Sequence, residues 1–277
     1  MQIRRLGTLT GSVLLFGGPY SNLPALEAMH AVAHQYDHAL CTGDVVAYGA
    51  QPRECVAIIR DWGLNTVAGN CERQLAEGRS NCGCGFDPGS QCDVASNAWF
   101  SYASDQIEPR DRAWMAQLPD IITFTHAGRH VAVLHGGVRA NNQFIWPTQA
   151  NDRRAAIAEL RAMVGPVDMV IAGHCGVGFI KREDDAVWLN AGVIGMPQND
   201  GDVRTVYATL TDEGVPNLHR LSYDHIKAAR SMVHAGLTQG YQTGLTTGWW
   251  PSEDILPLVL RRASSPRERV MIEYQSL

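Results

Sequence analysis

The chain has very little lysine, no cluster of basic residues and no long apolar run. Of its 23 basic residues 21 are arginines, and the formal net charge is −5. Without a basic run, a nucleic-acid-binding surface is not expected. The early apolar run Val13–Phe16 is too short for a signal-peptide core and much too short for a membrane span. These absences predict a cytoplasmic protein that does not contact membranes.

The rest of the composition is that of a globular protein. Apolar residues make up 45% of the 277 positions and charged residues 18%, a balance that supports a sizeable core. Seven cysteines in a chain without a secretory signal indicate thiol, metal or redox chemistry rather than a disulfide framework. No linker or internal repeat divides the chain. We predict one domain over residues 1–277 with a helical tail from about residue 224, and leave a homo-oligomer open.

The order of apolar runs predicts repeated strand–loop–helix units followed by a β-meander. Asn22 is predicted to cap a helix with an early Pro24, and Pro52 to open a second helix. A polar, glycine-rich loop is expected between Glu72 and Val94. The other predicted helices are 95–102, 111–117 and 151–163. The predicted strands are 13–16, 36–42, 64–68, 120–125, 130–134, 168–172, 177–181, 186–189, 203–210 and 218–221.

Polar pairs stand at the ends of four of these predicted strands. They are Gly43-Asp44, Gly69-Asn70, His135-Gly136 and Gly173-His174. Carboxyl ends of buried strands are where open α/β sheets place their ligands. An Asp, an Asn and two His supply oxygen and nitrogen donors that suit one cation. The pattern therefore predicts a metal site with four candidate ligands: Asp44, Asn70, His135 and His174.

The order of these four pairs resembles the calcineurin-like metallophosphoesterases, in particular their small bacterial phosphodiesterase-like branch. Further blocks that resemble this branch are 21–28, 43–49, 190–195 and 223–237, so that the resemblance spans about residues 12–240. It implies an α/β fold of four layers (α/β/β/α), in which a β-sandwich is flanked by helices. The metal centre is then expected at one end of the sheets.

The chain departs from the family pattern at four positions. Gly18 and Tyr20 stand where the family carries an Asp and a His that bind the first metal, and Gly176 replaces a further His of that metal. Cys71 stands where a His of the family assists the leaving group. The resemblance thus implies that the four candidate ligands form a complete set for the second metal, while the first position is stripped.

We therefore predict a metal-dependent phosphoesterase with an atypical centre, acting on a small phosphate mono- or diester such as a nucleotide. The expected cofactor is a divalent transition metal (Mn, Fe, Zn or Ni), one ion unless cysteines rebuild the stripped position. Water activated by the metal is the expected nucleophile, and Asn22, Cys71 and Glu72 are candidates for orienting the substrate. The alternatives are a non-hydrolytic metal- or redox-binding protein on the same fold, and an interaction module that uses Trp249 and Trp250.

Cysteines near the predicted site leave several interpretations open. We expect Cys71, Cys82, Cys84, Cys92 and Cys175 on loops, where thiolates could bind a soft metal. The Cys-x-Cys spacing of the loop is not the usual Cys-x2-Cys of zinc sites. A disulfide, a redox-active thiol pair or plain buried thiols are therefore equally open. Tyr20 is a metal ligand, a phosphate contact or a wall of the site.

Overall fold

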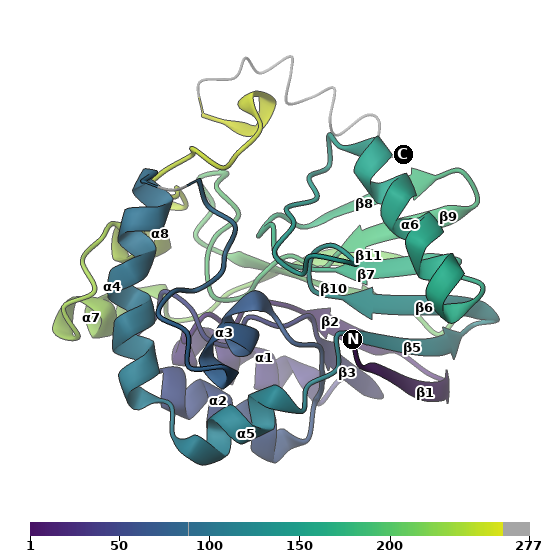
Figure 1. Ribbon diagram of the computed structural model, residues 1–277, viewed down its shortest axis with the longest axis horizontal. Coiled ribbons are helices and arrows are strands. Elements are labelled where there is room, and N and C mark those ends of the chain that lie inside the picture. Colours follow the sequence, from purple (N-terminus) through teal and green to yellow (C-terminus); the bar gives the residue numbers. More distant parts are fainter. Residues whose placement is uncertain (88, 263–277) are drawn as a thin grey trace.

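The computed structural model describes residues 1–87 and 89–262, which form two stacked β-sheets flanked by helices (Figure 1). One sheet has six strands in the order β1-β5-β6-β7-β9-β8, and the other has five in the order β11-β10-β2-β3-β4. The strands are β1 (Ile3–Leu9), β2 (Val13–Phe16), β3 (His38–Cys41), β4 (Asn65–Thr66), β5 (Ile121–His126), β6 (Arg129–Leu134), β7 (Met169–Ala172), β8 (Phe179–Glu183), β9 (Ala186–Asn190), β10 (Thr205–Leu210) and β11 (Pro216–Leu221). The helices are α1 (Leu23–Ala33), α2 (Pro52–Trp62), α3 (Asn70–Ala76), α4 (Gln91–Gln106), α5 (Pro109–Ala116), α6 (Ala150–Val164), α7 (His225–His234), α8 (Tyr241–Thr247) and the short 3-10 helix η1 (Leu258–Leu260).

The sheets pack face to face, and helices cover both outer faces. Strand β2 shows why its sequence is apolar throughout: Val13 and Leu15 face the core between the sheets, while Leu14 and Phe16 face the helices beside the five-stranded sheet. A strand buried on both faces loses the usual alternation of polar and apolar residues. On the far side, Leu160 of α6 packs with residues of the six-stranded sheet. The predicted four-layer α/β/β/α arrangement is confirmed.

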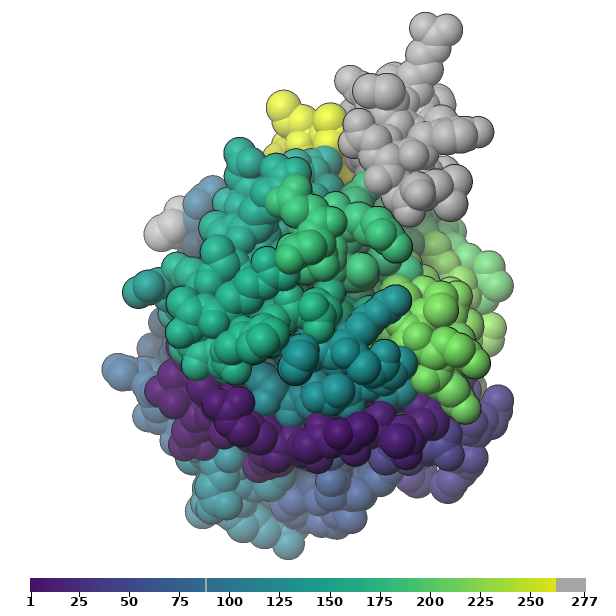
Figure 2. Space-filling model, turned by 90° about the vertical axis from the view of Figure 1, so that its right-hand side faces the viewer, coloured from purple at the N-terminus to yellow at the C-terminus, as the bar shows by residue number. Residues whose placement is uncertain are grey.

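Strand β1 was not predicted from the sequence. It pairs in parallel with β5 at the edge of the six-stranded sheet, with a register shift between Arg5 and Thr8. None of its seven residues is buried, so it has no apolar pattern that could reveal it. Figure 2 shows the N-terminal residues as a purple band along the surface.

The predicted loop from Glu72 to Val94 is wrong at both ends. Helix α3 begins at Asn70 and α4 begins at Gln91. The strand before α3 is also shorter than expected, because β4 has only two residues. Asn70 is consequently the first residue of a helix and does not directly follow a strand.

Other local predictions are confirmed. Asn22 caps α1, its side-chain oxygen accepting from the Ala25 N–H at 3.2 Å, and Pro52 opens α2. The described part of the C-terminal tail contains α7, α8 and η1, and residues 263–277 lie outside the described residues. Within the described ranges, no helix is long and apolar enough to cross a membrane.

Candidate metal centre

Side chains from both sheets meet at one end of the sandwich. Asp44 follows β3 in the five-stranded sheet, whereas His135 and His174 follow the parallel strands β6 and β7 of the other sheet. One ligand atom from each of these three buried side chains lies within 4.8 Å of the others. The amide of Asn70, at the start of α3, joins them. The structure thus brings together the four residues that the sequence singled out.

The nitrogen His135 Nε2 lies at the centre of this group. It is 3.2 Å from Asp44 Oδ2, 3.1 Å from Asn70 Oδ1 and 3.0 Å from His174 Nδ1. The other ring nitrogen, Nδ1, lies 2.6 Å from the Thr42 carbonyl oxygen, which can only accept a hydrogen bond. In the neutral ring the proton therefore sits on Nδ1, and Nε2 directs a lone pair into the group.

The amide of Asn70 is oriented so that its oxygen also faces this group. Its Nδ2 donates to the Cys82 carbonyl oxygen at 2.9 Å, so that Oδ1 faces His135. Carboxylate, amide and imidazole lone pairs then point at a common space, an arrangement that repels unless a cation or a proton lies between them. Such a mixed nitrogen and oxygen set is typical of sites for divalent transition metals. The residues present fit a divalent cation.

Electrostatics keep His174 neutral and Asp44 ionised, the forms in which these side chains bind a metal. Burial, reinforced by neighbouring His135, lowers the pKa of His174 to about 3, so the ring is neutral at pH 7. His174 Nε2 is buried and has no hydrogen-bond partner among the described residues. Burial opposes ionisation of Asp44, but the nearby His135 outweighs it and lowers the pKa of the carboxyl. The same attraction to Asp44 raises the pKa of His135 against the effect of burial.

The backbone is strained where it presents these ligands. Asp44 (φ 53°) and His174 (φ 62°) both adopt the left-handed conformation, which costs a non-glycine residue about 1–3 kcal/mol. Gly43 (φ 93°) and Gly69 permit the close approach of the two loops. A Cβ on Gly43 would lie 2.6 Å from the Gly69 nitrogen, and one on Gly69 would lie 2.1 Å from Asp44 Oδ1. Only glycine fits these two positions.

Glu72 holds the Asp44 loop in place through hydrogen bonds to its backbone. Its Oε2 accepts from the backbone N–H groups of Asp44 at 2.8 Å and Gly69 at 2.9 Å, and Oε1 accepts from Val46 at 3.3 Å. Burial and the nearby Asp44 carboxylate raise the pKa of Glu72 to about 7. The side chain is fully buried and is not among the residues that line the adjoining cavity. Its contacts make it a support of the centre.

Asn22, another candidate for orienting a substrate, is also occupied by the fold. Besides capping α1, it donates from Nδ2 to the Gly195 carbonyl at 3.0 Å and to the Tyr223 hydroxyl at 3.2 Å. It does not line the cavity beside the candidate ligands.

A cavity of about 50 Å³ opens beside Asp44 and His174. Phe144 forms one wall, with its ring centroid 4.3 Å from that of His174. The aromatic lining is Tyr20, Tyr48, Phe86, Phe144, Tyr241 and Trp250. Of these, the sequence singled out only Tyr20, as a site residue, and Trp250, as part of an interaction module. They come from separate loops and helices, and no periodicity or strand-end pattern marks them.

Bulky side chains lie next to Gly18 and Gly176, two of the positions at which the chain departs from the family pattern. A Cβ on Gly18 would lie 2.7 Å from Cζ of Tyr20 and 2.6 Å from Cγ1 of Val193. A Cβ on Gly176 would lie 3.1 Å from Cζ2 of Trp250. Tyr20 itself is buried with a φ of 52°. A side chain in place of Gly18 would therefore collide with Tyr20 and Val193, and one in place of Gly176 would press against Trp250.

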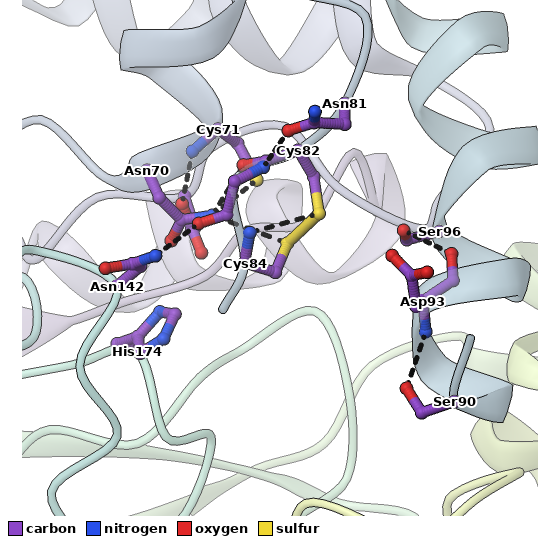
Figure 3. The surroundings of a disulfide bond; sticks show 12 residues. Asn70, Cys71, Asn81, Cys82, Cys84, Ser90, Asp93, Ser96, Asn142 and His174 are labelled. Carbon is purple, nitrogen blue, oxygen red and sulfur yellow. Dashed lines mark hydrogen bonds between the residues drawn. A yellow bond between two sulfur atoms is a disulfide. The ribbon is translucent and has the colours of Figure 1, made fainter. Parts of the chain in front are cut away.

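The cysteines do not all lie where the sequence suggested. Cys71 belongs to α3 and Cys92 to α4, so the expectation that both lie on loops is wrong. Cys82 and Cys84 are joined by a disulfide beside Asn70 (Figure 3). Cys175, directly after His174, and Cys92 both line the cavity.

The remaining thiols stay in their protonated form by virtue of burial. Burial, followed by the carboxylates of Asp44 and Glu72, raises the pKa of Cys71 well above its usual range. Burial likewise raises the pKa of Cys175 to about 12. Its Sγ lies 3.2 Å from Nδ2 of Asn190, which also donates to the Gly173 carbonyl and so supports the loop that carries His174.

Comparison with known proteins bears on the family and the fold. The model of the calcineurin-like phosphoesterase superfamily domain matches residues 21–213. An uncharacterized protein of Methanocaldococcus jannaschii is 23% identical over 231 residues, which cover 75% of this chain and 87% of that protein.

Solved structures share the fold. A metallophosphoesterase from Sphaerobacter thermophilus superposes with a TM-score of 0.67 at 22% identity, covering 87% of this chain and 100% of that one. A hypothetical protein from Pyrococcus horikoshii OT3 superposes with a TM-score of 0.70 at 15% identity, covering 86% and 98%. Since the family model matches well over half of its length, the chain belongs to the calcineurin-like phosphoesterase superfamily.

Proposed function

We propose that the protein hydrolyses small phosphate esters with a single divalent transition-metal ion, held by Asp44, Asn70, His135 and His174. The observation that carries this proposal is the convergence of four lone-pair-bearing atoms: His135 Nε2 and three others that lie 3.0–3.2 Å from it. Membership of a phosphoesterase superfamily supports the reaction class.

The packing around the neighbouring position supports one ion in preference to two. Gly18 and Gly176 offer no donor side chain, and the atoms that crowd them belong to Tyr20, Val193 and Trp250. A second cation would therefore lack its ligands. A centre with one cation neutralises less charge than a two-metal clamp, so we expect slower turnover of unactivated esters.

Each part of the site has a defined task in this proposal. A divalent ion, when bound, lowers the pKa of a water ligand and polarises a phosphoryl oxygen. The Thr42 carbonyl holds the His135 ring in the tautomer that binds metal. Burial and then Asp44 raise the pKa of Tyr20 well above its usual range, so the phenol keeps its proton. That phenol lines the cavity and is suited to donate a hydrogen bond to a phosphoryl oxygen.

The size and lining of the cavity bear on the substrate. At about 50 Å³ it has room for a few water molecules, which suits a phosphoryl group and not a whole nucleotide. The remainder of a larger ester would extend past the aromatic walls. We therefore propose a small mono- or diester, with the phosphoryl group next to Asp44 and His174.

The test combines metal analysis with hydrolysis. Untagged protein should contain about one equivalent of Mn, Fe, Zn or Ni and should hydrolyse bis(4-nitrophenyl) phosphate. Asp44→Asn should lose the metal and lower the turnover at least 100-fold, because it removes the negative charge of a ligand and leaves the weaker amide oxygen in its place. Asp185→Asn, at a largely exposed side chain on the surface, is the matched control and should retain both. Turnover that survives both chelation and Asp44→Asn would refute the assignment.

A second candidate function is non-hydrolytic binding of a metal with redox chemistry on the same fold. The observation in its favour is the Cys82–Cys84 disulfide beside Asn70. One equivalent of metal without turnover of any phosphate ester would select this alternative.

A further inference from the structure

We propose that Cys82 and Cys84 form a redox-active disulfide that reacts with small thiols, and that its reduction weakens metal binding at the neighbouring centre. The inference rests on the metal site proposed above but not on hydrolysis. It assigns a chemical task to a cysteine pair that the phosphoesterase reaction leaves unused.

The disulfide loop holds a metal ligand in place. The Cys82 carbonyl, inside the ring that the disulfide closes, accepts from Asn70 Nδ2 at 2.9 Å. The same nitrogen is 3.4 Å from Cys84 Sγ. With its amide nitrogen turned toward the loop, Asn70 directs Oδ1 at His135 Nε2, 3.1 Å away. Figure 3 shows Asn70 lying against this loop.

The loop also contacts the opposite side of the centre. Asn142 Nδ2 donates to the Gly83 carbonyl at 2.9 Å, and a Cβ on Gly85 would lie 2.9 Å from the Asn142 carbonyl oxygen. Asn142 belongs to the segment after β6 that begins with His135 and continues to Phe144. The disulfide loop therefore bridges Asn70 of α3 and Asn142 (Figure 3). Asn142 lies in the loop that carries the proposed ligand His135 and the wall residue Phe144.

The two glycines that flank Cys84 make this bridge dependent on the S–S bond. Gly83 (φ 61°) and Gly85 (φ 78°) both adopt the left-handed conformation, and glycine has the largest conformational freedom to regain when a constraint is lost. Once the ring is open, the Cys82 carbonyl is no longer fixed opposite Asn70. The amide of Asn70 can then rotate, and its oxygen no longer points reliably at the metal position.

A third sulfur lies close to the pair. Cys71 Sγ is 3.5 Å from Asn70 Nδ2, and Cys84 Sγ is 3.4 Å from the same atom. The two sulfurs are therefore at most about 6.9 Å apart, the sum of these distances. Reduction would place three thiols around the amide of Asn70 in place of one disulfide and one thiol.

The reaction is ordinary thiol–disulfide exchange with a low-molecular-weight thiol as reductant. A thiolate attacks one sulfur of the disulfide, forming a mixed disulfide and releasing the other cysteine as a thiolate that takes up a proton. A second reductant thiolate displaces the first, giving the reductant disulfide and the second free cysteine. Two electrons and two protons pass to Cys82 and Cys84. Cys84 lines the cavity, which gives a small thiol its approach.

The experiment measures metal affinity in both redox states. Metal-free protein is prepared oxidised, and reduced with dithiothreitol that is then removed without oxygen, and each form is titrated with Mn²⁺ by calorimetry. Manganese is chosen because thiols bind it poorly, so the new thiols do not replace the lost ligand. Since loss of a partner that orients a ligand costs about 10- to 100-fold in affinity, the reduced form should bind Mn²⁺ at least about tenfold more weakly.

Variants separate the disulfide from general effects of reduction. The double variant Cys82→Ser/Cys84→Ser should bind Mn²⁺ as weakly as the reduced protein and should not respond to dithiothreitol. Cys55→Ala removes a buried thiol on α2 and should keep the full redox response. Alkylation of the unfolded, unreduced protein should modify five of the seven cysteines, and all seven after reduction.

Each contrary result has a distinct meaning. Equal Mn²⁺ affinities in the two states, or tighter binding after reduction, would overturn the redox inference while leaving the metal site intact. Alkylation of all seven cysteines without reduction would overturn it as well, because no disulfide would exist. Failure of the oxidised protein to bind Mn²⁺ at all would overturn both the inference and the proposed site.

Discussion

Glu72 should stabilise the fold through its contacts with three backbone N–H groups. In Glu72→Ala the N–H groups of Asp44, Gly69 and Val46 lose their acceptor. Each buried donor left without a partner costs about 1–3 kcal/mol. Removing the carboxyl also removes the cost of burying it, a cost reflected in the pKa raised to about 7. We therefore take the lower part of the range and expect a loss of about 3 kcal/mol in the free energy of unfolding.

Replacement by glutamine should be milder. A glutamine oxygen in place of Oε2 still accepts from Asp44 and Gly69, whereas its NH2 group would face the Val46 N–H. With one unfavourable contact in place of three lost bonds, we expect a loss of about 1 kcal/mol. Glu77→Ala, at an exposed side chain just after α3, is the control and should change stability by less than about 0.5 kcal/mol.

The assay is urea unfolding of metal-free protein in excess chelator, followed by circular dichroism. For a chain of this size the alanine variant should also melt about 6–10 °C lower than the parent protein. An unfolding free energy of Glu72→Ala within about 0.5 kcal/mol of the parent would refute the bracing role. A Glu72→Gln protein with parental stability and metal content but no turnover would instead mean that the carboxylate acts on the substrate.

Three further predictions follow from the packing of the site and the sheet. Arg153→Ala should lower the free energy of unfolding in urea by about 3–5 kcal/mol, because it leaves a buried Glu183 carboxylate without its main partner, 2.7 Å away. Arg154 is a half-exposed partner of the same Glu183, and Arg154→Ala should cost less than about 1 kcal/mol. Equal losses in the two variants would contradict this. Gly69→Ala should reduce metal content and lower the free energy of unfolding by about 1–3 kcal/mol, since its methyl group would collide with Asp44 Oδ1. Unchanged metal content would show that the loop moves to accommodate the methyl group. Tyr20→Phe keeps the ring beside Gly18 and all four proposed ligands, so elemental analysis should still find one metal, while turnover falls about 100-fold through loss of one donor. A second equivalent of metal would disprove the proposal of a single ion.

Much of the framework could be predicted from the sequence because its signals are local. Strands such as Val13–Phe16 and Met169–Ala172 are buried on both faces, so they are apolar without interruption. Asn22 and Pro52 mark helix starts through the geometry of a single turn. The four candidate ligands were recognisable because each stands beside a glycine, in an order that resembles a known family.

Other features were decided by contacts between distant residues. β1 is exposed along its whole length and exists because β5 offers it an edge. The loop expected after Glu72 is partly helix: besides its local contact with the Gly69 N–H, Glu72 accepts from the N–H of the distant Asp44 and so holds the start of α3 against the Asp44 loop. No local pattern of residues encodes such partners.

The details of the centre that bear on function were also decided by contacts between distant residues. The sequence showed that Gly18 and Gly176 lack donor atoms, but only the folded chain shows that Tyr20 and Trp250 crowd them. Likewise, Cys-x-Cys left metal binding and a disulfide open, and the tertiary structure joins the pair beneath Asn70. The identity of a ligand is a local property that the sequence determines. Whether the space beside it is open, filled or bridged depends on side chains brought there from elsewhere in the chain, and the tertiary structure alone decides it.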